Sequence, residues 1–133
     1  MKFLLMVYTD PKLMDALPEG EFDRMMRGCL QKADELRARG TLIDAQQLEE
    51  PVTAKSVRAR NGNTTIFDGP FAEAKEVFAG FNLIEARDIE EALEIAHSFP
   101  WIRVGSIEVR PVRDMEAVAG RVGAWGCFPS RRL

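Results

Sequence analysis

Eight side chains that we predict to form one site are of types that bind small polar or anionic molecules. Guanidinium and ammonium groups attract anions, carboxylates and hydroxyls exchange hydrogen bonds, and tyrosine combines an apolar ring with a polar tip. Asp68 is also the residue that we predict to act in catalysis, because it opens the distinctive turn Asp68-Gly69-Pro70-Phe71. The predicted ligand-binding set is Tyr8, Lys55, Asp68, Glu73, Lys75, Ser106, Glu108 and Arg110.

The same residues have structural interpretations. In the turn, an aspartate can accept hydrogen bonds from following amides, glycine tolerates unusual φ angles, and proline favours the first position of a helical turn. Glu108 and Arg110 are two residues apart on one predicted strand, so they can pair with each other instead of holding a ligand. Both interpretations stay open from the sequence.

The histidine and cysteine content predicts neither a metal site nor a cofactor. The one histidine, His97, shares a helix face with Glu90 and Glu94 and is predicted to be solvated. It falls in the last helical turn, where a cation interacts favourably with the helix dipole. Cys29 and Cys127 are far apart and lack metal-type spacing, and Cys29 is predicted to be a buried, unreactive thiol.

Composition predicts one globular domain. The chain has 133 residues, of which 46% are hydrophobic and 29% charged. The formal net charge of -3 provides no global basic field, so we predict no nucleic-acid partner. The apolar run Phe3–Tyr8 is too short for a signal peptide or a membrane span, so we predict a cytoplasmic protein without membrane attachment.

The first half of the chain predicts a strand, a helix and a second strand. The almost continuously apolar run Lys2–Tyr8 is typical of a central strand that is covered on both faces. Helical spacing of apolar residues predicts a helix over Glu21–Arg39 that Gly40 caps. Thr41–Gln47 is predicted as the second strand. The apolar helix stripe consists of Phe22, Met25, Met26, Cys29, Leu30, Ala33 and Leu36.

Asn61-Gly62 predicts a tight hairpin between Lys55–Arg60 and Asn63–Asp68. A type I′ turn requires positive φ at both central residues, which asparagine and glycine tolerate. The two-residue loop sets the register and places Lys55 opposite Asp68. We therefore expect Asp68 to be a paired carboxylate rather than a proton-transfer group.

The second half repeats the pattern of strand, helix and strand. Val77–Ala86 is predicted as a strand in which Gly80 marks a bulge or a close backbone approach. Asp88 is predicted to cap a helix over Ile89–Ser98. The final strand, Gly105–Val112, alternates polar Ser106, Glu108 and Arg110 with Ile107 and Val109. The residues predicted to face inward from the second helix are Ile89, Ala92, Leu93 and Ala96.

This order predicts an α+β, ferredoxin-like domain with a hairpin inserted between two strand-helix-strand halves. The sheet is antiparallel and both helices cover one face. The other face is partly apolar and uncovered, which favours packing on a second copy as a homodimer of the dimeric α+β barrel type. The domain is predicted to span residues 1-113, and residues 114-133 form a C-terminal extension.

The stretch from Asp68, "DGPFAEAKEVFAGFNLIEARDIEEALEIAHSFP", and the later "GSIEVRPV" resemble the DGPF family within the YCII-related superfamily. The resemblance implies a dimeric ferredoxin-like fold. It also implies a His/Asp dyad in some relatives, with the histidine in the first half of the domain. This chain has no histidine there, so the dyad does not carry over. Fusions of relatives to sigma-70-type factors imply a sigma-factor-related protein partner.

Three functions of different classes follow from the residues and the resemblance. The favoured one is a small-molecule-binding accessory or sensor protein with a ligand cleft near the Asp68 turn and the open sheet face. The second is a lyase or hydrolase that uses Asp68 or Glu73 without histidine. The third is a protein-interaction module linked to transcription regulation by sigma factors.

Overall fold

The computed structural model describes residues 1–72 and 74–124. Among these residues, no helix is long and apolar enough to cross a membrane. The elements in chain order are β1 (Lys2–Thr9), α1 (Pro11–Asp15), α2 (Glu21–Ala38), β2 (Leu42–Gln47), η1 (Pro51–Thr53), β3 (Lys55–Arg60), β4 (Asn63–Asp68), β5 (Val77–Glu85), α3 (Ile89–His97), η2 (Pro100–Val104), β6 (Gly105–Pro111) and α4 (Met115–Val122).

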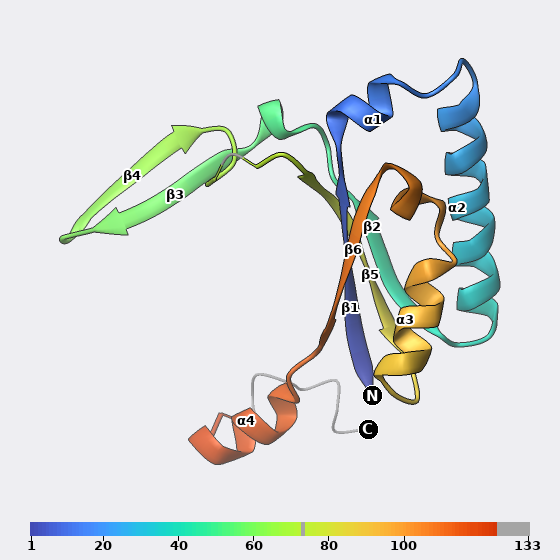
Figure 1. Cartoon of the computed structure of the whole chain (residues 1–133). Coiled ribbons are helices and arrows are strands. Elements are labelled where there is room, and N and C mark those ends of the chain that lie inside the picture. The colour runs from blue at the N-terminus through green and yellow to red at the C-terminus, as the bar shows by residue number, and fades with distance from the viewer. Residues whose placement is uncertain (73, 125–133) are drawn as a thin grey trace.

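Four strands form an antiparallel sheet in the order β2-β5-β1-β6, and α2 and α3 cover one of its faces (Figure 1). Strands β1 and β5, from different halves of the chain, are the two central strands. This arrangement confirms the α+β, ferredoxin-like fold predicted from the sequence. The hairpin β3–β4 forms a separate two-stranded sheet, as an insertion between the halves.

Local sequence signals set the ends of both long helices. Helix α2 ends at Ala38, and Gly40 adopts the left-handed conformation with φ of 77°, as predicted for a C-terminal cap. At the start of α3, the carboxylate of Asp88 accepts a hydrogen bond of 2.9 Å from the backbone N–H of Glu91. These caps satisfy backbone groups that a helix end leaves without partners.

Leu93 is a correction to the predicted inner face of α3. Its side chain is 51% exposed, while Ala92, Ile95 and Ala96 are buried. Consecutive residues lie about 100° apart around a helix, so a face centred on Ala92 and Ile95–Ala96 turns Leu93 toward solvent.

The hydrophobic core lies between the sheet and the helices. Alternate residues of β1, namely Phe3, Leu5 and Val7, are buried against this helical layer. The intervening side chains of β1 are only half-buried in the single chain, so the predicted cover of its second face stays a prediction. We call this second surface the open face. It carries Leu4, Met6 and Tyr8 of β1, Phe78, Phe81 and Leu83 of β5, and Ser106, Glu108 and Arg110 of β6.

Gly80 accounts for both features predicted at its position. The β1–β5 register shifts there, since Val7 pairs with Gly80 and Tyr8 pairs with Phe78. A Cβ atom on Gly80 would lie 2.6 Å from the carbonyl oxygen of Gln46 in the neighbouring strand. The bulge and the close approach of β2 therefore both depend on glycine at this position.

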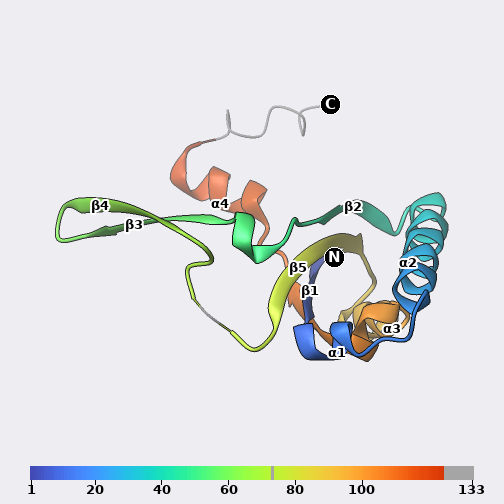
Figure 2. The same cartoon turned by 90° about the horizontal axis from the view of Figure 1, so that it is seen from above.

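Residues Lys55–Asp68 form an arm that projects away from the four-stranded sheet (Figures 1 and 2). Asn61 and Gly62 have φ angles of 52° and 80°, and Lys55 lies opposite Asp68, as predicted. Helix α4 projects on the same side, away from α2 (Figure 1). It belongs to the predicted C-terminal extension, of which residues 125–133, including Cys127, lie outside the described residues.

Candidate functional site

The structure brings three of the predicted ligand-binding residues together on the open face. Tyr8, Ser106 and Glu108 line a shallow hollow of about 500 Å³ together with Ala74, Glu76 and Ile107. The ring of Tyr8 lies 5.4 Å from that of Phe78, which holds it at the end of β1. The remaining predicted residues do not line this hollow, and Glu73 lies outside the described residues.

Lys55 and Asp68 lie in the arm instead. Their charged groups are 2.5 Å apart, and their side chains are 70% and 84% exposed. Arg110 pairs with Glu108 along β6, so the ion pair considered for these two residues is confirmed. Lys75 is exposed on the connection to β5. Neither Asp68 nor Arg110 lines a hollow described here, and the ligand roles of the predicted set stay predictions.

The turn after Asp68 closes the base of the arm. Gly69 has a φ of 90°, and its N–H donates a hydrogen bond of 2.8 Å to the carbonyl of Ala54. The hydroxyl of Ser56 donates a hydrogen bond of 2.8 Å to the carbonyl of Gly69. These bonds tie the two ends of the hairpin together. Of the structural features considered for the Asp68-Gly69-Pro70-Phe71 motif, the unusual φ of Gly69 is confirmed.

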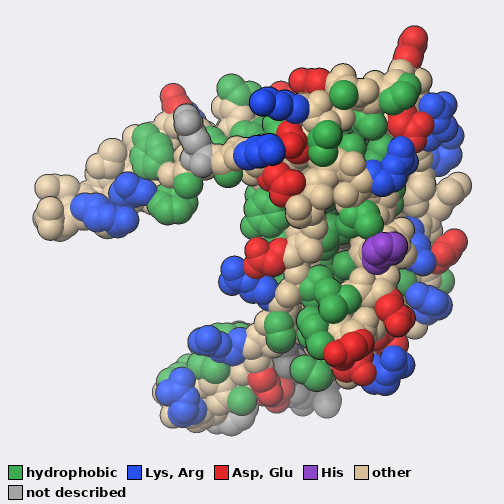
Figure 3. All heavy atoms as spheres, viewed as in Figure 1, with side chains coloured by type: hydrophobic (Ala, Val, Ile, Leu, Met, Phe, Trp, Pro, Cys, Tyr) green, Lys and Arg blue, Asp and Glu red, His purple; other side chains and the backbone are tan. Residues whose placement is uncertain are grey.

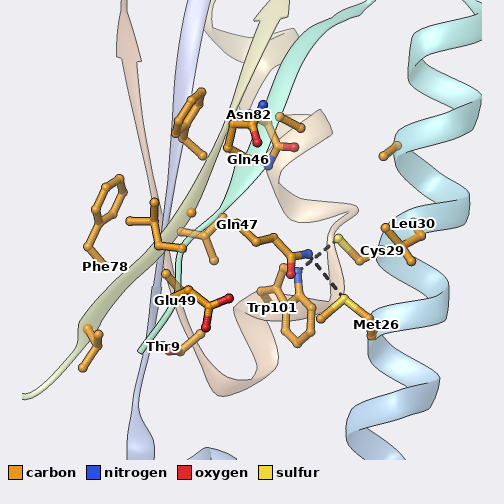
Figure 4. Close-up of a pocket in the computed structure, with 18 of the residues that line it drawn as sticks. Thr9, Met26, Cys29, Leu30, Gln46, Gln47, Glu49, Phe78, Asn82 and Trp101 are labelled. Atoms are coloured by element: carbon orange, nitrogen blue, oxygen red, sulfur yellow. Dashed lines mark hydrogen bonds between the residues drawn. The ribbon is translucent and has the colours of Figure 1, made fainter. Parts of the chain in front are cut away.

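A larger cavity of about 680 Å³ lies between α2 and the edge of the sheet formed by β2 and β5 (Figure 4). We call it the helix-side cavity. None of the eight residues predicted to bind ligand lines it. Part of its apolar lining comes from the helix stripe that the sequence already shows, and the rest comes from the strands, the loops and Trp101. The lining residues used below are Phe22, Met26, Cys29, Leu30, Asn82 and Trp101.

The apolar wall combines α2 with Trp101 of η2. The indole N–H of Trp101 donates a hydrogen bond of 3.1 Å to the sulfur of Cys29, and the rings of Trp101 and Phe22 lie 5.8 Å apart. Phe22 and Leu30 are nevertheless 41% and 55% exposed. Two large apolar side chains of the predicted core stripe therefore border a space instead of filling it.

An ion pair fixes the segment that supplies Trp101. Arg103 lies 3.1 Å from Glu21 at the start of α2. Hydrogen bonds from Arg24 and Arg103 lower the pKa of Glu21, which favours its charged form. The pair connects η2 to α2 across 82 residues of sequence, which keeps Trp101 against the cavity.

The thiol of Cys29 is poorly suited to nucleophilic chemistry. Burial raises its pKa, and the hydrogen bond from Trp101 only partly opposes this effect. A thiol with a raised pKa stays protonated near neutral pH, and the protonated form is a weak nucleophile. Cys29 is buried, as predicted, and contributes an apolar wall to the cavity.

Asn82 is the exceptional polar group of the cavity. It lies in β5 and is only 8% exposed, and no buried side-chain nitrogen or oxygen atom lacks a hydrogen-bond partner among the described residues. The amide of Gln47 donates a hydrogen bond of 3.3 Å to the sulfur of Met26. Figure 4 shows Asn82 beside Gln46 at one end of the cavity. An amide in the wall of a cavity can accept and donate hydrogen bonds to a molecule inside it.

Sequence reasoning missed Asn82 because polar residues inside an apolar strand are usually assigned to the exposed side. The sequence feature that could have predicted its burial is its position in β5. It lies two residues from Gly80 and therefore on the same face of the strand. The charged residues of the cavity lie toward its mouth. Asp34 and Arg37, for example, form an exposed ion pair of 3.1 Å. The result is an apolar chamber with one buried amide and a charged rim.

Comparisons with known proteins identify the family and two similar proteins. The family model of the YCII-related domain matches residues 1–116. An uncharacterized protein of Rhizobium meliloti (strain 1021) is 32% identical over 114 residues, which cover 84% of this chain and 92% of that protein. A solved structure of 5-chloro-2-hydroxyhydroquinone dehydrochlorinase from Burkholderia phenoliruptrix AC1100, in complex with 2,5-dihydroxybenzoquinone, has a TM-score of 0.48 and 15% identity. That match covers 85% of this chain and 94% of the solved chain.

Proposed function

The chain belongs to the YCII-related domain family, and we propose that it is a small-molecule-binding accessory or sensor protein whose ligand occupies the helix-side cavity. The observation that carries this proposal is the position of Asn82, a side chain only 8% exposed whose residue lines a largely apolar cavity. A ligand that makes one net hydrogen bond with this amide gains about 1 kcal/mol on binding.

The cavity favours a mainly apolar ligand with one polar group. Its volume of about 680 Å³ is in the range of small-molecule sites. Trp101 and Phe22 offer ring surfaces, and Leu30 offers an aliphatic one. We therefore place the ligand in this cavity rather than beside Asp68, whose ion pair is exposed to solvent. A neutral molecule with one hydroxyl or carbonyl group fits this lining better than the small anion predicted at Arg110.

Binding fits the chemistry of the cavity better than catalysis does. The thiol of Cys29 is held protonated, and His97 is exposed on α3 and does not line the cavity. The alternative of a lyase or hydrolase that uses Asp68 or Glu73 stays a prediction. The sigma-factor-related partner and the cytoplasmic location also stay predictions.

We further infer that the protein forms a homodimer through the open face. The middle of this face carries the half-buried apolar side chains of Leu4, Met6 and Phe81, and its β6 edge carries the charged pair Glu108–Arg110. An apolar centre with a polar rim is typical of protein interfaces. A twofold axis would bury this surface against its own copy.

Binding of naphthalene and 1-naphthol tests the cavity and its amide separately. Both molecules are apolar and aromatic, and only 1-naphthol has a hydroxyl group. We expect wild-type protein to bind both, with 1-naphthol about fivefold tighter, because one net hydrogen bond contributes about 1 kcal/mol. In Asn82→Leu, which keeps a similar side-chain volume, this preference should disappear while naphthalene still binds. Titration calorimetry or quenching of tryptophan fluorescence measures both affinities.

Two controls make this experiment decisive. Ala45→Trp fills part of the cavity from β2 and should abolish binding of both molecules, whereas Leu93→Lys on the outer surface of α3 should change neither affinity. Asn82→Leu should unfold at the same or a higher temperature than wild type, because it replaces a mostly buried amide by an apolar side chain of similar volume. Failure of wild type to bind either molecule, or an unchanged preference for 1-naphthol in Asn82→Leu, would contradict the proposal.

A further inference from the structure

The arm has one apolar face that nothing covers among the described residues. Val57 and Ile66 pair directly across the two strands and are 70% and 68% exposed. Ala59 and Thr64 form the next pair along the same side and are also exposed. We call these four residues the apolar arm face. A two-stranded hairpin is only marginally stable on its own in water, and exposed apolar patches often mark interaction sites.

The opposite face of the arm is partly covered by its own chain, since Ser56, Arg58 and Phe67 are half-buried while Phe71 is 68% exposed. The guanidinium of Arg58 lies 5.9 Å from the ring centre of Phe67 and 5.0 Å from that of Phe71. Ser56 is hydrogen-bonded to Gly69. The two faces therefore differ in kind. On one face, Arg58 makes cation–π contacts with Phe67 and Phe71. On the other face, the Val57–Ile66 pair is apolar and exposed.

We propose that the apolar arm face docks on the body of a second copy of this chain, so that two arms clasp a homodimer. This inference rests on the dimer proposed above and adds a second surface to it. The arm includes Lys55, Arg58 and Arg60 against one carboxylate, Asp68, which gives it a net charge of +2. Because the whole chain has a net charge of -3, the other residues carry -5. A basic arm and an acidic body are complementary between two copies of the same chain.

The direction in which the arm projects allows it to contact a second copy seated on the open face. The arm and α4 project on the side of the sheet away from α2, which is the side of the open face (Figures 1 and 2). Figure 3 shows a hollow between them, with hydrophobic side chains of the sheet at its base. Six-residue strands extend about 20 Å, enough to pass beside a second domain seated on the open face. Twofold symmetry then gives each copy the same contact with the other's arm.

The double variant Val57→Glu/Ile66→Lys tests the clasp without destroying the hairpin. The two new side chains face each other across the strands, where an opposite-charge pair supports the hairpin while the apolar surface is lost. Sedimentation equilibrium should show a wild-type dimer at micromolar concentration. Because two apolar side chains are lost from each arm, we expect the variant to dimerise about a hundredfold more weakly or worse. Val57→Thr/Ile66→Thr keeps the β-branched shape and should show an intermediate loss.

Two further variants separate the clasp from the open-face dimer. Phe81→Glu places a charge on the open face and should also dissociate the dimer, whereas Leu93→Lys on the far side of α3 should not. A dimer that Phe81→Glu dissociates but both arm variants leave as tight as wild type overturns the clasp and keeps the open-face interface. A monomeric wild type overturns both proposals. Tight binding of duplex DNA that Arg58→Ala/Arg60→Ala abolishes, without a change in dimerisation by the arm variants, would assign the arm to nucleic acid and overturn the clasp.

Discussion

The four-stranded sheet and the arm are both antiparallel β structure, but their isoleucines have opposite environments. Ile84 of β5 is 0% exposed, because α2 and α3 form a second layer over that face of the sheet. Ile66 of β4 is 68% exposed, because the arm is a single layer. Strand pairing is thus similar in the two regions. The difference in burial comes from the presence or absence of a packed second layer.

The same difference decides where a small molecule can be enclosed. The helix-side cavity exists because α2 and the β2–β5 edge form two walls, and Trp101 adds a third. The arm has no second wall, so the charged groups of Lys55 and Asp68 stay solvated and their ion pair contributes little to stability. The most distinctive polar motif of the sequence therefore lies in the region least able to enclose a ligand.

Replacing isoleucine by alanine in each region is expected to give the largest contrast. Ile84→Ala should lower the free energy of unfolding by about 2–5 kcal/mol, because it removes a fully buried side chain and leaves a cavity. Ile66→Ala should lower it by less than about 0.5 kcal/mol in dilute protein. Urea unfolding followed by circular dichroism measures both values.

Protein concentration sharpens this comparison. If the arms clasp a dimer, the loss for Ile66→Ala should grow as the concentration rises above the dissociation constant, because binding stabilises only the folded state. The difference between Ile84→Ala and wild type should stay constant over the same range. Equal losses for the two variants in dilute protein would show that the arm is packed on its own body.

Local signals predicted the strands of both regions, the two long helices and the register of the arm. Asn61-Gly62 set the hairpin pairing, Gly40 set the end of α2, and Gly80 marked the bulge in β5. Each of these signals acts within a few residues of chain. Backbone conformation at a glycine or a tight turn depends on sterics that are present in the sequence itself.

The cavity could not be predicted in this way. Periodicity placed Cys29 and Leu30 on one helix stripe, but it does not say which surface lies opposite. The apolar wall of the helix-side cavity depends on the contact of Cys29 with Trp101, which lies 72 residues away in the sequence. The direction in which the arm projects is also a tertiary property. Asn82 was missed for the same reason, since its place in the cavity wall is visible only when the surrounding elements are placed.

Replacing glycine by alanine should also lower the free energy of unfolding more in the sheet than in the arm, but the difference should be smaller than for isoleucine. A Cβ atom on Gly105 in β6 would lie 1.9 Å from the backbone carbonyl oxygen of Tyr8 in β1. Backbone atoms of a central strand cannot move aside easily, so Gly105→Ala should lower the free energy of unfolding by about 2–3 kcal/mol.

At Gly62 in the arm, a Cβ atom meets nothing within 4 Å, and the cost comes only from its φ of 80°. Gly62→Ala should therefore strain the turn by about 1 kcal/mol and leave the melting temperature of the four-stranded domain unchanged. Differential scanning calorimetry measures both variants. A drop in melting temperature for Gly62→Ala as large as that for Gly105→Ala would mean that the arm and the sheet unfold as one unit.

Replacing one aspartate in each region gives the smallest contrast, and pH provides its signature. The hydrogen bond from the backbone N–H of Glu91, assisted by the charge of Arg87, lowers the pKa of Asp88 at the start of α3. A carboxylate with a lowered folded-state pKa stabilises the fold above its unfolded pKa of about 3.9 and loses that effect as the pH falls through the folded value. Asp88→Ala should thus lower the melting temperature by a few degrees at pH 7, and the difference from wild type should shrink below pH 4 or so.

Asp88→Asn keeps a capping group and should retain most of the stability. Asp68→Asn in the arm should leave the melting temperature unchanged at pH 7, because its ion pair with Lys55 is exposed. Melting curves of the three variants between pH 2 and pH 7 measure this contrast. A pH-independent loss for Asp88→Ala would assign the effect to packing instead of the charged cap.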